Sequence, residues 1–167
     1  FAEISGGATS RPKYYTNLAL ETPERNQPYF AFDGTDDSWR SDDAAADFSF
    51  LSDGSNFTVI VVIDPAKHAD PFVLAATNSG DAAQKGFIFW LECDGTSSTL
   101  WHAQYTGASW SSSPASCDVA PGRPAICTIR KQGSTTITYV NGEVMRSITS
   151  LSTASGTPQH SLTIGQG

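Results

Sequence analysis

Long apolar segments and basic residues are both scarce in this sequence. Its apolar runs, such as Val59 to Ile63, have the length of one strand and are far too short to cross a bilayer as a helix. Lys and Arg number 10 against 17 Asp and Glu, which gives a formal net charge of −7. An acidic surface repels phosphate backbones, and no basic amphipathic stretch is present to hold a membrane surface. We therefore expect neither nucleic acid binding nor membrane insertion.

Cysteine and methionine are also rare. The odd number of cysteines, Cys93, Cys117 and Cys127, argues against a complete disulfide framework, and the absence of a C-x-x-C pair argues against a zinc ribbon. One bridge with one free thiol, or three buried thiols, both fit the sequence, because free cysteine behaves as a small apolar residue. The only methionine is Met145 and residue 1 is Phe, so we expect the chain to be part of a longer protein.

What the chain does contain is a series of strand and turn signals. Charged residues make up only 16%, while Gly, Ser and Thr are abundant, and this balance favours strands over helices. After an irregular stretch, residues 1–27, the expected strands are Tyr29–Phe32, Phe57–Ile63, Pro71–Ala76, Gly86–Leu91, Thr99–Tyr105, Ala125–Arg130, Thr135–Val140, Glu143–Ile148 and Ser161–Ile164. Short strands at this spacing predict an all-β fold, a two-sheet antiparallel sandwich or jelly roll, as a single domain over residues 1–167.

Three segments make more specific predictions. Phe57–Ile63 is apolar on both faces, which predicts a central strand covered on both sides. Asn141-Gly142 can supply the two positive φ angles of a type I′ turn, so a tight hairpin is expected there. Residues 106–124 are rich in Ser, Gly and Pro and are expected to form a loop that contains Trp110.

Several motifs, taken in order, resemble the laminin-G-like jelly rolls of the concanavalin-A-like superfamily. Phe30-Ala31-Phe32-Asp33-Gly34-Thr35-Asp36-Asp37 resembles the F-D-G-x-D-D strand and turn of this family, and Phe57 to Val62 resembles its following core strand. Tyr139-Val140-Asn141-Gly142, with Leu162-Thr163-Ile164-Gly165 after it, resembles its Y-V-N-G hairpin and L-x-I-G strand. The order and spacing fit across residues 8–167. The resemblance implies the fold, and this fold hosts many functions.

The resemblance also implies an opening strand upstream of Ala8 and a closing strand after Gly165, and neither is found in this sequence. A sandwich without these strands exposes sheet edges that invite pairing. We therefore expect the edge at Leu162–Ile164, or at the strand beside it, to be completed by neighbouring chain segments or by a subunit of a larger assembly, or else to be visibly incomplete.

No complete catalytic arrangement is evident. Some relatives of this fold hydrolyse glycans with an E-x-D-x-x-E motif, which Glu92-Cys93-Asp94 begins, but Ser97 stands in place of the last Glu. Without that acid the leaving group cannot be protonated. The sequence has no G-x-S-x-G elbow, and its three histidines, His68, His102 and His160, are isolated. We expect no enzymatic activity.

Calcium is the one cofactor that the sequence leaves open. Its acidic residues include two groups, Asp33, Asp36 and Asp37, and Asp42, Asp43 and Asp47. Calcium needs several converging oxygen ligands, and the resemblance implies such a site at a loop rim. Turn chemistry and a solvated loop explain the same aspartates and are the favoured interpretation.

Aromatic residues near strand ends and in loops are the candidate ligand-binding residues. They are Trp110, Tyr105, His102 and Trp39, with Trp110 foremost because it lies in the polar stretch Ser109 to Ser113. Sugars stack their C–H faces on aromatic rings while polar groups bind their hydroxyls. Trp90 and Trp101 are expected in the core.

We expect a non-catalytic carbohydrate-binding or cell-adhesion module of a larger extracellular, cell-surface or virion protein, with a glycan or other surface ligand as its partner. The alternative is a purely structural virion component, such as a phage tail-fibre, capsid-decoration or capsid-associated domain. A glycoside hydrolase is the least favoured function, for the reason given at Glu92.

Overall fold

The computed structural model is almost entirely β and describes residues 13–15, 29–32, 37–65, 71–93, 97–149 and 151–165. Its strands are β1 (Lys13–Tyr15), β2 (Tyr29–Ala31), β3 (Trp39–Arg40), β4 (Phe57–Ile63), β5 (Phe72–Ala76), β6 (Lys85–Cys93), β7 (Ser98–Thr106), β8 (Trp110–Cys117), β9 (Ala125–Gln132), β10 (Thr135–Val140), β11 (Glu143–Thr149) and β12 (Thr163–Ile164). A 3-10 helix, η1, spans Ala45–Leu51. No helix within the described residues has the length and hydropathy needed to cross a membrane.

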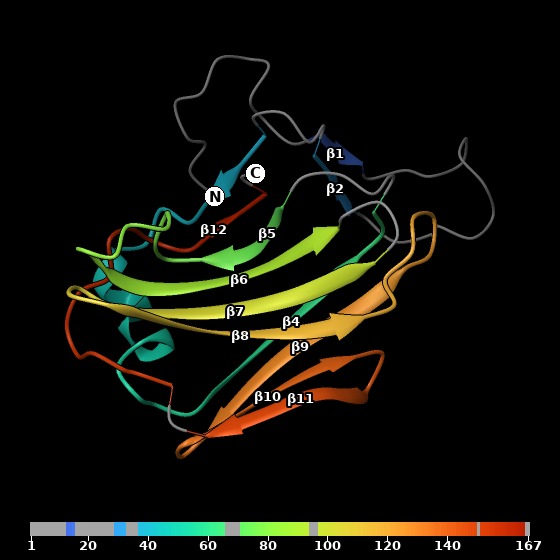
Figure 1. The fold of residues 1–167 in the computed structure, drawn as a ribbon. Coiled ribbons are helices and arrows are strands. Elements are labelled where there is room, and N and C mark those ends of the chain that lie inside the picture. Colours follow the sequence, from blue (N-terminus) through green and yellow to red (C-terminus); the bar gives the residue numbers. More distant parts are fainter. Residues whose placement is uncertain are drawn as a thin grey trace.

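Two antiparallel sheets form a sandwich, which confirms the predicted fold class. The larger sheet has the strand order β3-β12-β5-β6-β7-β8 and the smaller one β11-β10-β9-β4, while β1 and β2 form a separate pair. In Figure 1 the larger sheet lies above the smaller one, with η1 at one end. Strand β1 lies within the stretch that the sequence predicts to be irregular.

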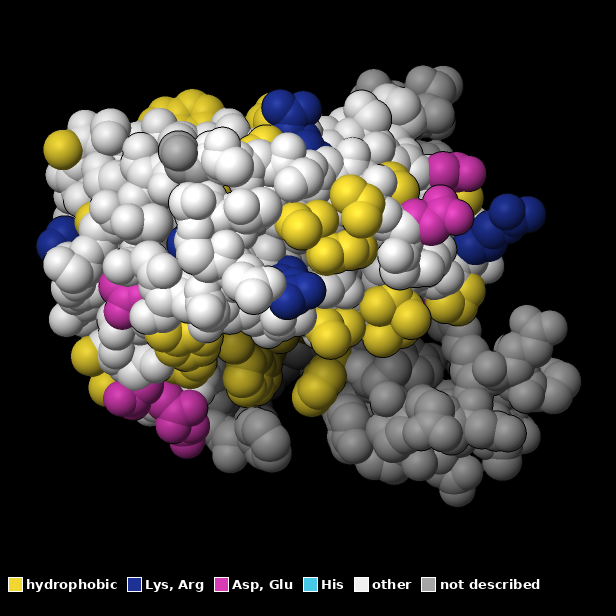
Figure 2. All heavy atoms as spheres, turned by 90° about the horizontal axis from the view of Figure 1, so that it is seen from below, with side chains coloured by type: hydrophobic (Ala, Val, Ile, Leu, Met, Phe, Trp, Pro, Cys, Tyr) yellow, Lys and Arg dark blue, Asp and Glu magenta, His cyan; other side chains and the backbone are white. Residues whose placement is uncertain are grey.

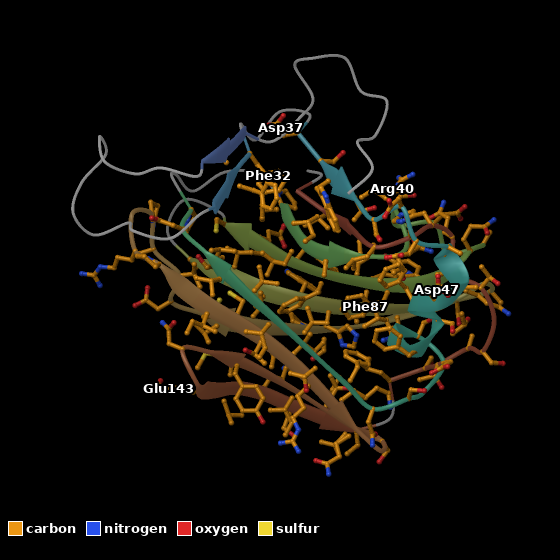
Figure 3. All side chains as sticks on the ribbon, turned by 180° about the vertical axis from the view of Figure 1, so that it is seen from behind. Phe32, Asp37, Arg40, Asp47, Phe87 and Glu143 are labelled. Carbon is orange, nitrogen blue, oxygen red and sulfur yellow. The ribbon has the colours of Figure 1, made fainter. Side chains whose placement is uncertain are left out.

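The hydrophobic core fills the space between the two sheets. Phe57 and Phe87, one from each sheet, meet edge to face with ring centroids 5.6 Å apart, and Figure 3 shows Phe87 inside the sandwich. Leu51 of η1 joins the same cluster, so the helix adds apolar side chains at one end of the core. The fully buried members also include Leu74, Phe89, Leu100, Cys127 and Ile129.

The predicted hairpin joins β10 to β11. Asn141 has a φ of 51° and Gly142 a φ of 85°, the two positive values that a type I′ turn needs. This turn and the continuous pairing of β9 with β10 make the three strands β9, β10 and β11 a meander. The hairpin predicted at Asn141-Gly142 is therefore confirmed.

The position of β4 differs from the prediction. Phe57–Ile63 pairs with β9 on one side and is the last strand of the four-stranded sheet, not a central strand. Its inward side chains pack against the core, but the outward Ile60 and Val62 are 64% and 69% exposed. A strand that is apolar on both faces predicts two covering layers, and here the described residues supply only one.

Leu162–Ile164 is not itself a sheet edge in the described part of the chain. Strand β12 pairs with β3 on one side and with β5 on the other. Among the described strands, the edges of the two sheets are β3, β8, β11 and β4. The two-residue strand β3, beside Leu162–Ile164, is thus the edge on that side of the larger sheet, and its completion by another chain stays a prediction.

Candidate functional site on the outer face of the larger sheet

The central strands of the larger sheet are apolar on both faces. On β6, Phe87, Phe89 and Leu91 belong to the core between the sheets. The alternating residues Ile88 and Trp90 belong to a second cluster on the opposite, outer face. The same alternation on β7 directs Trp101, Ala103 and Tyr105 outward, so the outer face of this sheet has an apolar surface of its own.

Strand register gathers four aromatic side chains on this outer face. Trp90 lies directly opposite Trp101, and their rings stack with centroids 5.4 Å apart and an interplanar angle of 6°. Tyr105 lies opposite Trp110, and these rings stack at 6.2 Å and 17°. We call the outer surface formed by Trp90, Trp101, Tyr105 and Trp110 the aromatic face.

The two stacked pairs present different amounts of ring to solvent. Trp110 is 54% exposed, whereas Tyr105 beneath it is 7% exposed. Burial raises the pKa of the Tyr105 phenol above its usual value. Trp90 and Trp101 are both partly exposed. Tyr105 therefore acts as a support that holds Trp110, and the Trp110 ring is the most accessible part of the face.

Polar side chains flank the stacked tryptophans. Glu92, Thr99 and Ser116 are paired across β6, β7 and β8 as the next outward-facing row beyond Trp90 and Trp101. Outward residues two positions apart along a strand are separated by about 7 Å. Glu92 and Ser116 are exposed. Hydrogen-bonding groups are therefore within reach of a ligand that stacks on the tryptophans.

The residues around Trp110 form a strand rather than the expected loop. Trp110–Cys117 pairs with β7 over its whole length and makes β8 an edge of the larger sheet. Pro114 is compatible with this position, because an edge strand has one side on which no N–H is needed. Serine and proline have a low strand propensity, which is why the sequence of this segment predicts a loop. Hydrogen bonding to β7 stabilises a strand here despite that low propensity. Placement at the edge also explains why the Trp110 ring is open to solvent.

His102, a predicted ligand-binding residue, lies on the inner side of β7 and is completely buried. Its Nε2 accepts a hydrogen bond from Gln104 Nε2 at 3.0 Å, and the same amide nitrogen donates to the Leu51 carbonyl at 2.8 Å. Burial, with a smaller contribution from the Lys131 charge, lowers the His102 pKa to about 3. The ring is a neutral core residue that a surface ligand cannot contact.

Trp39, another predicted residue, is not part of the aromatic face. It lies on β3, separated from β8 by the full width of the sheet, about 24 Å at about 4.8 Å per strand. Its neighbour Arg40 donates to Thr163 Oγ1 at 3.2 Å, and Thr163 is paired with Ala76 of the outer cluster. Alternation along β3 therefore directs Trp39 to the inner side.

Of the four predicted residues, the structure brings together Tyr105 and Trp110. Trp90 and Trp101, which the sequence predicts to be core residues, lie instead on the outer face and complete the aromatic face. The sequence feature that could have indicated them is the alternation of aromatic residues on the two neighbouring strands. This alternation shows that both faces of the larger sheet are apolar, but not which face the smaller sheet covers.

All three cysteines are free thiols. Cys93 and Cys117 are paired with Ser98 from opposite sides, so two strand spacings, about 9.6 Å, separate them. This exceeds the Cα separation that a disulfide allows. Burial raises the pKa of Cys117 to about 11 and that of Cys127 to about 12. The structure therefore supports three free thiols over one bridge.

The predicted calcium ligands are only partly described. Asp33 and Asp36 lie outside the described residues, and Asp37 is buried. In the described part of the chain, no group of three or more His, Cys, Asp or Glu side chains could hold a metal ion. The second acidic group, Asp42, Asp43 and Asp47, thus forms no such site.

No protein-family model and no curated protein matches the chain. The carbohydrate binding module CBM66 from Bacillus subtilis is a similar solved structure, with 10% sequence identity, a TM-score of 0.47, and coverage of 78% of each chain. Sheep galectin-11 in complex with glycerol is similar with 15% identity and a TM-score of 0.43, over 70% of this chain and 85% of that chain. Neither similarity is high enough to assign the chain to a family.

Proposed function

We propose that the aromatic face binds a glycan and that the protein is a non-catalytic carbohydrate-binding module. The observation that supports this function is the gathering of two stacked aromatic pairs on one outer sheet face, with the Trp110 ring 54% exposed. Sugars combine apolar C–H faces, which stack on such rings, with hydroxyls that need hydrogen bonds. The polar row of Glu92, Thr99 and Ser116 offers those hydrogen bonds.

The spacing of the two pairs favours an oligosaccharide over a single sugar. Trp101 and Tyr105 are four residues apart on β7, a distance of about 14 Å along a strand. A ligand that touches both pairs must therefore extend across the face. Stacking at two separated places also contributes more binding free energy than one isolated contact.

The same face favours binding over hydrolysis. Glycosidases of the usual kind need two carboxyl groups flanking the scissile bond. Among the described outward-facing residues next to the stacked tryptophans, Glu92 is the acidic side chain. It is paired with Thr99, which is in turn paired with Ser116. A lone carboxylate can accept hydrogen bonds from sugar hydroxyls but cannot complete the acid-base pair.

We further propose, from the sequence motifs, that the chain belongs to the laminin-G-like group. We also propose that the protein lies on a cell surface, in the extracellular space or on a virion. An adhesion role follows from glycan binding at such a surface. The aromatic face is where we propose that this contact occurs.

A glycan array followed by titration of the best ligand tests the proposal. We expect Trp110→Ala and Trp101→Ala each to weaken binding by about tenfold or more, because a buried aromatic contact at a binding site typically contributes at least about 1.4 kcal/mol. We also expect no shortening of the bound glycan.

Phe50→Ala is the matched control, because Phe50 is 42% exposed on η1, outside the aromatic face. This variant should bind like the wild type. Urea unfolding should show that Trp110→Ala remains folded. Unchanged binding in both tryptophan variants, or unfolding of Trp110→Ala, would contradict the proposal.

A further inference from the structure

Strand β4 ends the smaller sheet with one side unpaired within the described structure. It pairs with β9 through seven consecutive residues, from Phe57 opposite Lys131 to Ile63 opposite Ala125. No other described strand pairs with it. The backbone N–H and C=O groups on its free side are therefore available to another strand.

Apolar side chains are also incompletely covered on both faces of the smaller sheet at this edge. On the outer face, Ile60 is 64% exposed and Val62 is 69% exposed, and Ile126 opposite Val62 is 45% exposed. On the inner face, Val59, Val61 and Ile63 pack against the core but remain only partly buried. Figure 2, seen from below, shows apolar side chains gathered on this lower surface. An added strand would cover apolar surface on both faces at once.

The features that protect sheet edges are missing from β4. Natural proteins block edges with charged side chains, proline, bulges or very short strands. Phe57–Ile63 contains no charged residue and no proline, and its register with β9 is uninterrupted over seven residues. Such an edge accepts another strand readily.

We propose that β4 pairs with β4 of a second copy of this chain, antiparallel and centred on Ile60. This register places Thr58 opposite Val62, and Val59 opposite Val61, of the other copy. β-Branched side chains then face each other at all of these positions, because the strand is nearly palindromic. The absence of charge also matters, since the whole chain has a net charge of −7 and a charged edge would repel its own copy.

The pairing would make one continuous eight-stranded sheet from the two smaller sheets. Its two-fold axis runs perpendicular to the sheet between the two central strands, so each copy contributes the same surface to the interface. Ile60, Val62 and Ile126 of both copies would then form one apolar area. A partner strand of unrelated sequence would lack this two-fold match.

Sedimentation velocity across a dilution series tests the proposal. The wild type should be a dimer that dissociates on dilution, and Ile60→Lys should be monomeric at concentrations at which the wild type is dimeric. Ile60 points outward, so the substitution leaves the core intact, and it places two lysines opposite each other at the two-fold axis. The control is Val144→Lys, which adds the same charge at a 58% exposed site on β11 and should leave the dimer unchanged.

A second variant tests the register directly. Residues opposite each other on antiparallel strands have Cβ atoms about 5 Å apart, so Ile60→Cys should form an intermolecular disulfide under mild oxidation far faster than Val144→Cys. A wild type that stays monomeric over the whole dilution series would overturn the proposal. So would a dimer that Val144→Lys dissociates and Ile60→Lys does not. If the β4 amides on the side away from β9 resist hydrogen exchange in a monomer, another segment covers the edge and the proposal also fails.

Discussion

At the scale of single residues, the surroundings of His102 determine its protonation. The ring is fully buried, and desolvation is the main cause of its pKa of about 3. Gln104 Nε2 donates to the Leu51 carbonyl and approaches His102 Nε2, which must therefore accept, so the proton of the neutral ring lies on Nδ1. The folded state excludes the imidazolium, whereas an unfolded chain binds that proton with a pKa near 6.5.

This difference predicts a loss of stability in acid. Between pH 6.5 and about 3, the unfolded chain binds one more proton at His102 than the folded chain, so the free energy of unfolding falls as the pH falls. The slope from this residue approaches about 1.4 kcal/mol per pH unit. His102→Gln keeps an acceptor for Gln104 and should remove that slope. Urea unfolding of both proteins between about pH 7 and about pH 4 measures it, and equal slopes would show that His102 is not the titrating group.

At the scale of elements, two glycines with positive φ have different structural roles. Gly142 closes the β10–β11 turn with a φ of 85°, and a Cβ there would meet nothing within 4 Å. Gly86 begins the outward row of β6 with a φ of 147°, and a Cβ there would lie 2.7 Å from the Thr77 carbonyl oxygen. Only the second position combines an unfavourable backbone conformation with a collision against backbone.

Alanine substitution should separate these two effects. Gly142→Ala should cost about 1 kcal/mol of unfolding free energy, because the left-handed conformation is its only penalty. Gly86→Ala should cost about 2–4 kcal/mol, since the collision with Thr77 forces the neighbouring strand to shift. Urea unfolding of both variants measures the difference. Equal costs would mean that the contact between Gly86 and Thr77 is looser than the structure shows.

At the scale of the whole molecule, the proposed dimer would place both aromatic faces on the same side. A two-fold axis perpendicular to the shared sheet keeps each larger sheet above its own smaller sheet (Figure 1). The outer faces of the two larger sheets then point in the same direction. Such an arrangement suits a surface that displays many copies of a glycan.

A dimer with two glycan sites should bind a surface more tightly as the density of immobilised glycan rises, whereas a monomer with one site should not. Ile60→Lys should bind a soluble monovalent glycan like the wild type, but should bind a dense glycan surface about a hundredfold more weakly or worse. Surface plasmon resonance at high and low ligand density measures both quantities. This result depends on both proposals. Loss of monovalent binding would count against the assignment of the glycan site, and equal binding at high density would count against the dimer.

Local patterns in the sequence were sufficient to predict the fold class, most strand positions and the hairpin. Asn141-Gly142 determines its turn through backbone conformations that few other pairs adopt. The apolar runs at Phe57–Ile63 and Gly86–Leu91 predict strands, because their residue types favour extended backbone. These signals act over a few residues and need no distant partner.

Only the tertiary structure decided which face of each strand is covered. Pairing between β4 and β9, and the position of the smaller sheet beneath β6 and β7, depend on contacts between distant residues. For this reason Phe57–Ile63 lies at an edge, and Trp90 and Trp101 lie on the outer face. The same alternation buries His102 and exposes Trp110. A period of two shows that a strand has two faces, and the layer packed against it determines which face becomes core and which is left for a ligand.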